Sequence, residues 1–321
     1  MILLAILSLA YSLSGGLKAV AMTDIVQVVL LIFGGLAVSY IALTKIGDGS
    51  IATGMLQVYQ QMPEKFDMIL SPDNPSYNNL PGIWILIGAG VWIGHFAYWG
   101  FNQYITQRAL GAKSLKEAQK GVMFAAYLKL LMPLVIVLPG ICAAVLFPVL
   151  EKTDQAYPTM MIELLPSGLL GLTFAALIAA IVSSLASMTN SISTIFTMDI
   201  CRSFSKQEIT QSSLIMIGRS AVVGSMLIAL VMAKPILGNS DQIFQYLQNF
   251  TGLFTPGILV IFLVALFWKK ATTLSVLVAA ILSVVMSVFI QATFPEFPYI
   301  HRMGAVFLSL IHISEPTRPI H

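Results

Sequence analysis

Seven apolar stretches, most of them about 20 residues or longer, constrain this chain more than any other feature of its sequence. At 1.5 Å per residue, a helix of that length crosses a hydrocarbon core of roughly 30 Å. Lipid offers no partner to a free peptide group, so we expect each stretch to be helical. The stretches are residues 25–43, 83–105, 122–147, 169–197, 215–232, 243–267 and 274–289. Only 10% of the residues are charged, which excludes an ordinary soluble domain. The sequence predicts an all-α, polytopic transmembrane helical bundle.

Charged residues between these stretches are sorted by sign. Cations gather in every second connection: Lys18; Arg108, Lys113, Lys116 and Lys120; Arg202 and Lys206; Lys269 and Lys270. Acids dominate the others: Asp48, Glu64, Asp67 and Asp73; Glu151, Asp154 and Glu163; Asp241; Glu296. The positive-inside rule makes the first set cytoplasmic. We expect a multi-pass protein of the plasma (inner) membrane. The net charge of +3 is not clustered, so we expect lipid and no nucleic acid as partner.

Both ends of the chain have unusual features. Residues 1–13 are apolar but too few to cross a bilayer, so we expect an N-terminal truncation. Residues 308–318 read LSLIHISEPTR, which resembles the translation of a transposon sequencing adapter. We therefore expect a partial membrane domain over residues 1–307 and an artefactual tail over residues 308–321.

Lys129 is placed deep in its apolar stretch. It lies about eight residues, or roughly 12 Å, from the cytoplasmic start. Ionisable groups at that depth cost several kcal/mol. The side chain either snorkels to the interface or lines a water-filled site.

Three ring-bearing residues, His95, Tyr98 and Trp99, share one helical face by their spacing. Tyr98 and Trp99 lie roughly 15 Å from the cytoplasmic surface, too deep for an interfacial belt. They are either plain core or a platform on which a sugar ring stacks. His95 is either structural or a ligand.

Gln248 lies about seven residues inside a stretch that enters from outside. Gly252, Pro256 and Gly257 follow it and predict a break in the helix. Such a break frees backbone groups to line a cavity. Gln248 is either part of a site or a hydrogen-bonding group between helices.

Small hydroxyl side chains are dense in the middle of residues 169–197, which contain Ser183, Ser184 and Ser187. They either allow close helix packing or supply oxygens to Na⁺, a hard cation. Asp24, near the cytoplasmic start of its helix, either favours the positive helix end or attracts a departing cation.

Four long segments carry a resemblance to a known family. They read YSLSGGLKAV with TDIVQV, YWGFNQYITQRALGAKSLKEAQKG, FAALIAAIVSSLASMTNSISTIFTMDI and FQYLQNFTGLFTPGILVIFLVALFWKK. Together they resemble the sodium:solute symporter family, above all its bacterial sodium/glucose and sodium/galactose cotransporters. The similarity extends over residues 10–307. It implies a LeuT-type inverted-repeat core that couples Na⁺ entry to sugar uptake.

The resemblance also implies roles for individual residues. The sugar would bind to Lys129, Gln248, Tyr98 and His95; Tyr98, Trp99 and Phe244 would form gates; Ala180, Ser183 and Ser184 would bind Na⁺; and Asp24 would lie on the Na⁺ exit route. His95 departs from the family pattern, in which a smaller polar donor stands. The first core helix of the family, with its Na⁺ and sugar ligands, would precede Met1.

Two alternatives to sugar symport remain. In the first, a protein of the same fold transports inositol, a sugar acid, an amino acid or a nucleoside. Lys129 with Gln248 nevertheless favours a polyhydroxylated ligand. In the other, the fold is that of a sensor that moves no solute. An enzyme is not expected, because no paired metal motif and no motif of nucleophile and base is present.

Overall fold

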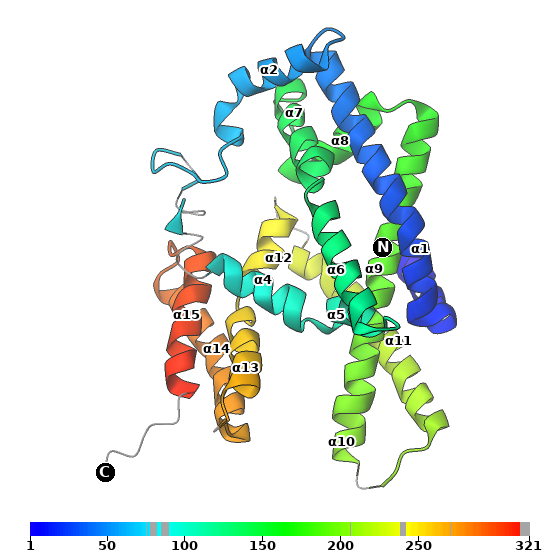
Figure 1. Ribbon diagram of the computed structural model, residues 1–321, viewed down its shortest axis with the longest axis vertical. Helices are drawn as coiled ribbons and strands as arrows, with labels where there is room; N and C mark the ends of the chain where they lie inside the picture. Colours follow the sequence, from blue (N-terminus) through cyan, green and yellow to red (C-terminus); the bar gives the residue numbers. More distant parts are fainter. Residues whose placement is uncertain are drawn as a thin grey trace. The chain divides into compact units, whose positions relative to one another are not determined.

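The structure is a computed structural model that describes residues 1–74, 76–77, 82–84, 90–205, 207–237, 242–269 and 271–314. The chain divides into two compact units, each described here by itself. The first unit comprises Met1–Met62 and Gln107–Asp241, and the second comprises Pro63–Thr106 and Gln242–His321. In the described ranges every regular element is a helix (Figure 1).

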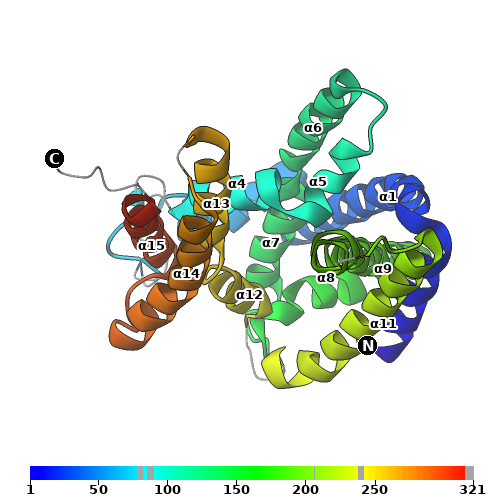
Figure 2. The same ribbon diagram turned by 90° about the horizontal axis from the view of Figure 1, so that it is seen from below.

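The first helix of the first unit is α1, which lies beside α9. They are α1 (Ile2–Ile46), α2 (Ile51–Gln61), α6 (Leu115–Lys129), the π-helical turn Pro133–Val137, α7 (Leu138–Leu146), α8 (Ala156–Leu164), α9 (Ser167–Thr194), a second π-helical segment Ile195–Cys201, α10 (Arg202–Phe204) and α11 (Gln211–Leu237). A short 3-10 turn, Thr153–Gln155, precedes α8. The side-by-side course of α1 and α9 is visible in both views (Figures 1 and 2).

Close packing of α1 depends on two adjacent glycines. A Cβ on Gly34 would lie 2.6 Å from the Thr173 side chain on α9, and a Cβ on Gly35 would lie 2.4 Å from Val135. Small residues of this kind let membrane helices approach closely without a hydrophobic driving force. The Ser39 hydroxyl donates to the carbonyl of Leu134, within the π-helical turn. These contacts hold α1 against both neighbours.

The second unit is built around α13. Its helices are α4 (Gly90–Phe101), α12 (Ile243–Thr251), α13 (Thr255–Phe267), α14 (Thr273–Thr293) and α15 (Tyr299–Ser314), with a 3-10 turn at Pro63–Lys65. α5 (Gln103–Leu110) crosses the division between the units. α13 packs against α4, α14 and α15, and its Leu259, Val260 and Val264 are buried in their shared core. Phe101 of α4 stacks on Phe262 of α13 with ring centroids 4.4 Å apart.

Most expected spans are present as long apolar helices. Among the described residues, five helices are long and apolar enough to cross a membrane: Ala21–Ile46, Leu115–Leu146, Ser167–Phe204, Gln211–Ile236 and Thr273–Thr293. The pair Ile243–Thr251 and Thr255–Phe267, bent by 42°, is long and apolar enough to make a sixth when the two helices are taken together. The bend lies where the glycines and proline after Gln248 predict a break. The chain is therefore a polytopic helical membrane protein.

The expected span at residues 83–105 differs from a single helix. Residues 85–89 lie outside the described ranges, and the described part is interrupted at Asn102 between α4 and α5. The Asn102 carbonyl accepts bonds from the amides of Ile105 and Thr106, at 3.1 and 3.0 Å, and so starts a new helical turn. Tyr98 and Trp99 consequently lie at the end of a short helix.

Residues 1–13 and 308–321 are the two ends singled out in the sequence. The apolar helix Ile2–Leu13 is shorter than a membrane span and belongs to α1. At the other end α15 runs without a break to Ser314, and Leu310 is buried beside Phe307. Residues 315–321 lie outside the described ranges. An artefactual origin of this tail stays a prediction.

Candidate functional site

A polar network joins α1 to α9 within the first unit. The Arg108 guanidinium donates from Nη2 to the Asp24 carboxylate at 2.9 Å and to the Ser187 hydroxyl at 2.7 Å. The Ser183 hydroxyl donates to the other Asp24 oxygen. Gln107 Nε2 donates to the Ser187 backbone carbonyl at 3.2 Å. The expected exit residue Asp24 and the expected cation ligand Ser183 are therefore in direct contact.

Helical spacing explains which serines of α9 join this network. Ser183 and Ser187 are four residues apart, so they lie on the same face of the helix, and both are buried. Ser184 points elsewhere and is exposed, while Ala180 is partly buried. Of the three residues expected to bind Na⁺, only Ser183 takes part in the network with Asp24.

The contact between Asp24 and Ser183 predicts an energetic coupling. In a double-mutant cycle with Asp24→Asn and Ser183→Ala, we expect about 1 kcal/mol of coupling in the free energy of unfolding. A hydrogen bond to a charged group is worth about 1.5–3 kcal/mol, and partial solvent exposure of Asp24 reduces that value. The measurement is reversible unfolding in mixed detergent micelles. Additive effects of the two substitutions would mean that the bond contributes nothing.

His95, Tyr98 and Trp99 lie on the exposed face of α4. Ile93 and Ala97 turn inward to the core of the second unit, whereas His95, Tyr98 and Trp99 are exposed. The Tyr98 and Trp99 rings meet edge to face, with centroids 5.2 Å apart and an interplanar angle of 84°. The Tyr98 hydroxyl is also hydrogen-bonded to that of Tyr104 at the start of α5. The three expected residues thus form one surface of the second unit.

The break between α12 and α13 is held open by two serines of α14. The Leu253 carbonyl accepts from the Ser283 and Ser287 hydroxyls, at 3.3 and 3.2 Å. The Gly257 amide donates to Ser283 Oγ at 2.9 Å. Backbone groups that a continuous helix would pair internally are thus satisfied by side chains, as a bent membrane helix requires.

Gln248 and Phe244 lie on α12, just before this break. They are four residues apart, and both side chains are exposed in the second unit. The Gln248 carbonyl accepts from the Gly252 amide at 2.9 Å, so Gln248 belongs to the last turn of the helix. The broken span therefore presents an amide side chain next to a helix end.

Lys129 belongs to the first unit, whereas the other expected sugar ligands belong to the second. It is the last residue of α6, and it is exposed. Pro133 has no amide hydrogen to donate to the Lys129 carbonyl four residues earlier. A lysine at such a helix end is favoured by the partial negative charge of the free carbonyls. His95, Tyr98, Trp99, Phe244 and Gln248 belong to the second unit.

Sequence reasoning missed the roles of three residues: Arg108, Ser283 and Ser287. Arg108 is identifiable from sequence only as a cytoplasmic charge, yet it bridges Asp24 and Ser187. Ser283 and Ser287 hold the break open. Their spacing of four residues in an apolar span was a usable signal, because buried hydroxyls need partners. In the described ranges, no group of three or more His, Cys, Asp or Glu side chains is placed to hold a metal.

Comparisons with known proteins agree on the kind of protein this chain resembles. The family described as "Sodium:solute symporter family" matches residues 1–283. The sodium/glucose cotransporter of Vibrio parahaemolyticus is 45% identical over 319 aligned residues, which cover 94% of this chain and 58% of the relative. The chain thus spans little more than half the length of that relative.

Two further similarities concern cargo and fold. Sodium/myo-inositol cotransporter 2 of Sus scrofa is 33% identical over 305 residues, covering 84% of this chain and 43% of that protein. A solved structure of a Na⁺-coupled sialic acid symporter, in a substrate-bound outward-open state, matches with a TM-score of 0.79 and 21% identity. It covers 100% of this chain and 66% of the other, and it shows that the two share a fold.

Proposed function

The chain belongs to the sodium:solute symporter family, and from this premise we propose that it forms part of a plasma-membrane transporter that couples inward Na⁺ flow to sugar uptake. The observation that carries the proposal is the 45% identity to a protein named sodium/glucose cotransporter. The polar residues on α4, α6 and α12 support it, because a polyol needs both ring faces and hydrogen-bonding groups. Transport, rather than catalysis, is the proposed activity.

The proposed sugar site is the one that the family membership implies. Lys129 and Gln248 donate hydrogen bonds to sugar hydroxyls, Tyr98 stacks on the ring, and His95 adds a polar contact. Trp99 supports Tyr98 by the edge-to-face contact described above. Phe244, one turn before Gln248, forms the outer apolar gate. Charged hydrogen bonds supply most of the affinity in such a site, since they are stronger than neutral ones.

The proposed Na⁺ path runs along α9 toward Asp24. Ala180 offers a backbone carbonyl, and Ser183 and Ser184 offer hydroxyl oxygens, which are ligands that a hard cation prefers. Asp24 already accepts from Ser183, so a cation leaving the serines meets a carboxylate next. Coupling then follows because Na⁺ and sugar both stabilise one conformation of a shared equilibrium.

Ser184→Ala tests the cation assignment. We expect the Na⁺ concentration for half-maximal sugar uptake to rise about fivefold, because a lost oxygen ligand is worth about 1 kcal/mol. The measurement is radiolabelled glucose and galactose uptake into proteoliposomes, with this chain expressed within its complete reading frame. Ser203→Ala, at the exposed end of the same span, is the matched control. An unchanged Na⁺ dependence would remove Ser184 from the site.

A cyclitol is the second candidate cargo. The similarity to sodium/myo-inositol cotransporters favours it, because myo-inositol presents the same ring of hydroxyls as a pyranose. Competition in the uptake assay separates the two cargoes. Stronger inhibition of galactose uptake by myo-inositol than by glucose would make the cyclitol the preferred solute. Absence of any Na⁺-driven uptake would reject the transport proposal.

A further inference from the structure

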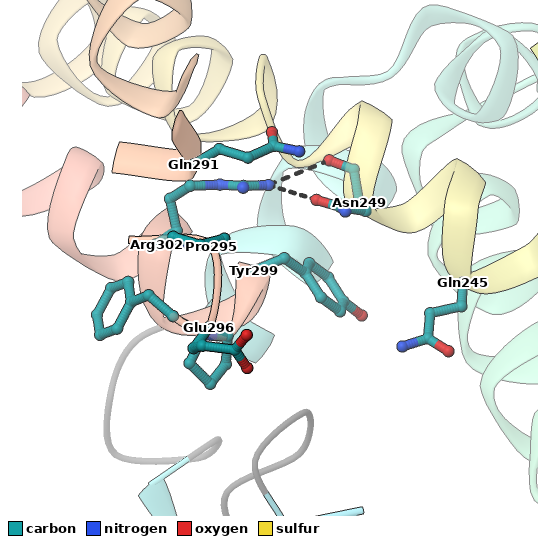
Figure 3. Close-up of a pocket in the computed structure, with 9 residues that line it drawn as sticks. Gln245, Asn249, Gln291, Pro295, Glu296, Tyr299 and Arg302 are labelled. Atoms are coloured by element: carbon teal, nitrogen blue, oxygen red, sulfur yellow. Dashed lines mark hydrogen bonds between the residues drawn. The ribbon is translucent and has the colours of Figure 1, made fainter. Parts of the chain in front are cut away.

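A cavity of about 140 Å³ lies at one end of α12, α14 and α15, within the second unit (Figure 3). Its floor is formed by Asn249 of α12 and Arg302 of α15, and Tyr299 lies on its wall. The exposed side chains of Gln245, Gln291 and Glu296 form its rim. By the charge rule applied to the sequence, this end of the helices faces the outside of the cell.

Arg302 on the floor carries a hydrogen-bond donor that has no partner in the described part of the chain. The residue is only 2% exposed, and its Nε is completely buried. Nη2 donates to the side-chain oxygen of Asn249 and, at 3.5 Å, to its backbone carbonyl. A buried donor without a partner costs about 1–3 kcal/mol. The guanidinium is thus suited to an oxygen supplied from the cavity.

The charges around the cavity balance. Arg302 supplies one positive charge, and Glu296 on the rim supplies one negative charge. Among the described residues no ion pair joins the two. An anion would meet Glu296 and a cation would meet Arg302, so a neutral ligand fits better than either. The ligand must also donate to a carboxylate and accept from a guanidinium, which a hydroxyl group does at once.

Size and apolar surface narrow the ligand further. An engineered protein cavity of about 150 Å³ admits benzene, so the present cavity takes the ring itself, while the hydroxyl groups of a hexose or cyclitol must extend through its open side. Tyr299 and Pro295 give flat apolar surface, and the amides of Gln245, Gln291 and Asn249 surround it with donors and acceptors. We propose that this cavity is a second binding site for a polyhydroxylated ring, a monosaccharide or a cyclitol, on the outer end of the second unit.

None of the residues expected to bind the transported sugar lines the cavity. Gln245 and Asn249 share one face of α12, whereas Phe244 and Gln248 share the neighbouring face, rotated by about 100°. An occupant that binds Arg302 and Asn249 would fix the same half-helix that carries Gln248. The choice of sugars as probes rests on the proposed function, whereas the cavity itself does not.

The test measures sugar binding with the expected transport residues removed. The background is Lys129→Ala with Gln248→Ala, purified in lipid nanodiscs and titrated with D-glucose, D-galactose and myo-inositol by saturation-transfer difference NMR in Na⁺-free buffer. Into it we place Gln245→Ala with Glu296→Gln. Both side chains are exposed, so neither change disturbs the core. The matched control is Gln60→Ala with Glu64→Gln, two exposed side chains that do not line the cavity.

We expect saturable binding of at least one probe in the background and in the control. The cavity pair should weaken it by about 10- to 100-fold, since the Gln245 hydrogen bond is lost and the charged bond to Glu296 becomes a weaker neutral one. No saturable binding in the background, or equal affinities for the cavity pair and the control, would overturn the inference. It would also be overturned if the cavity pair altered the binding of acetate and left that of the sugars unchanged. If the cavity binds sugar but the complete protein shows no Na⁺-driven uptake, only the proposed function is rejected.

Discussion

Gly257→Ala is expected to lower the stability of the protein by about 1–3 kcal/mol, the usual cost of overfilling a packed site. A Cβ at this position would lie 2.6 Å from Ser283 Cβ and 2.7 Å from its Oγ, closer than real atoms approach. α13 and α14 must then move apart, and the Ser283 bonds to the Gly257 amide and the Leu253 carbonyl weaken. Thermal unfolding in detergent measures the effect.

Gly224 provides the matched control. It lies within α11, and a Cβ there would meet nothing within 4 Å. Gly224→Ala should therefore raise stability by about 0.5–1 kcal/mol, because alanine loses less backbone freedom on folding. The double variant Ser283→Gly with Gly257→Ala should lose less stability than the sum of the two single variants, because Ser283→Gly removes the side chain that the new Cβ would meet. The same response at both glycines would contradict the packing described for the break.

Lys129→Ala is expected to weaken sugar binding by about 1–3 kcal/mol, or roughly 5- to 150-fold, if the lysine donates a charged hydrogen bond to the cargo. The measurement is equilibrium binding of radiolabelled D-galactose in NaCl, with this chain expressed within its complete reading frame. The free energy of unfolding measured without Na⁺ should change little, because the Lys129 side chain is exposed in its own unit.

Two controls separate a binding role from a structural one. Lys116→Ala removes the same charge near the start of α6, on an exposed side chain, and should leave affinity unchanged. Lys129→Met keeps the apolar stem and should lose affinity as Lys129→Ala does. If both Lys129 variants retain full affinity and unfold at lower temperature, the lysine stabilises the helix end and does not bind sugar.

Local physics made several features predictable from sequence. The lengths of the spans follow from the thickness of a bilayer and the rise of a helix. The bend after Gln248 follows from Gly252, Pro256 and Gly257, which interrupt helical bonding. The shared face of His95, Tyr98 and Trp99 follows from 3.6 residues per turn, and the structure leaves this face exposed while Ile93 is buried. The interruption at Asn102 escaped prediction, because Gly100, two residues earlier, is a weak signal: glycines are common within membrane helices.

The sequence by itself thus determined that the chain is a membrane protein of bent and straight helices, and which residues lie on each helical face. Only the tertiary structure decided which faces meet. Asp24 reaches Arg108 across 84 residues and Ser183 across 159, and Arg302 reaches Asn249 across 53. Helical periodicity relates residues within a few turns of one another. Contacts at such separations instead depend on where whole helices pack, which is set by all their side chains together.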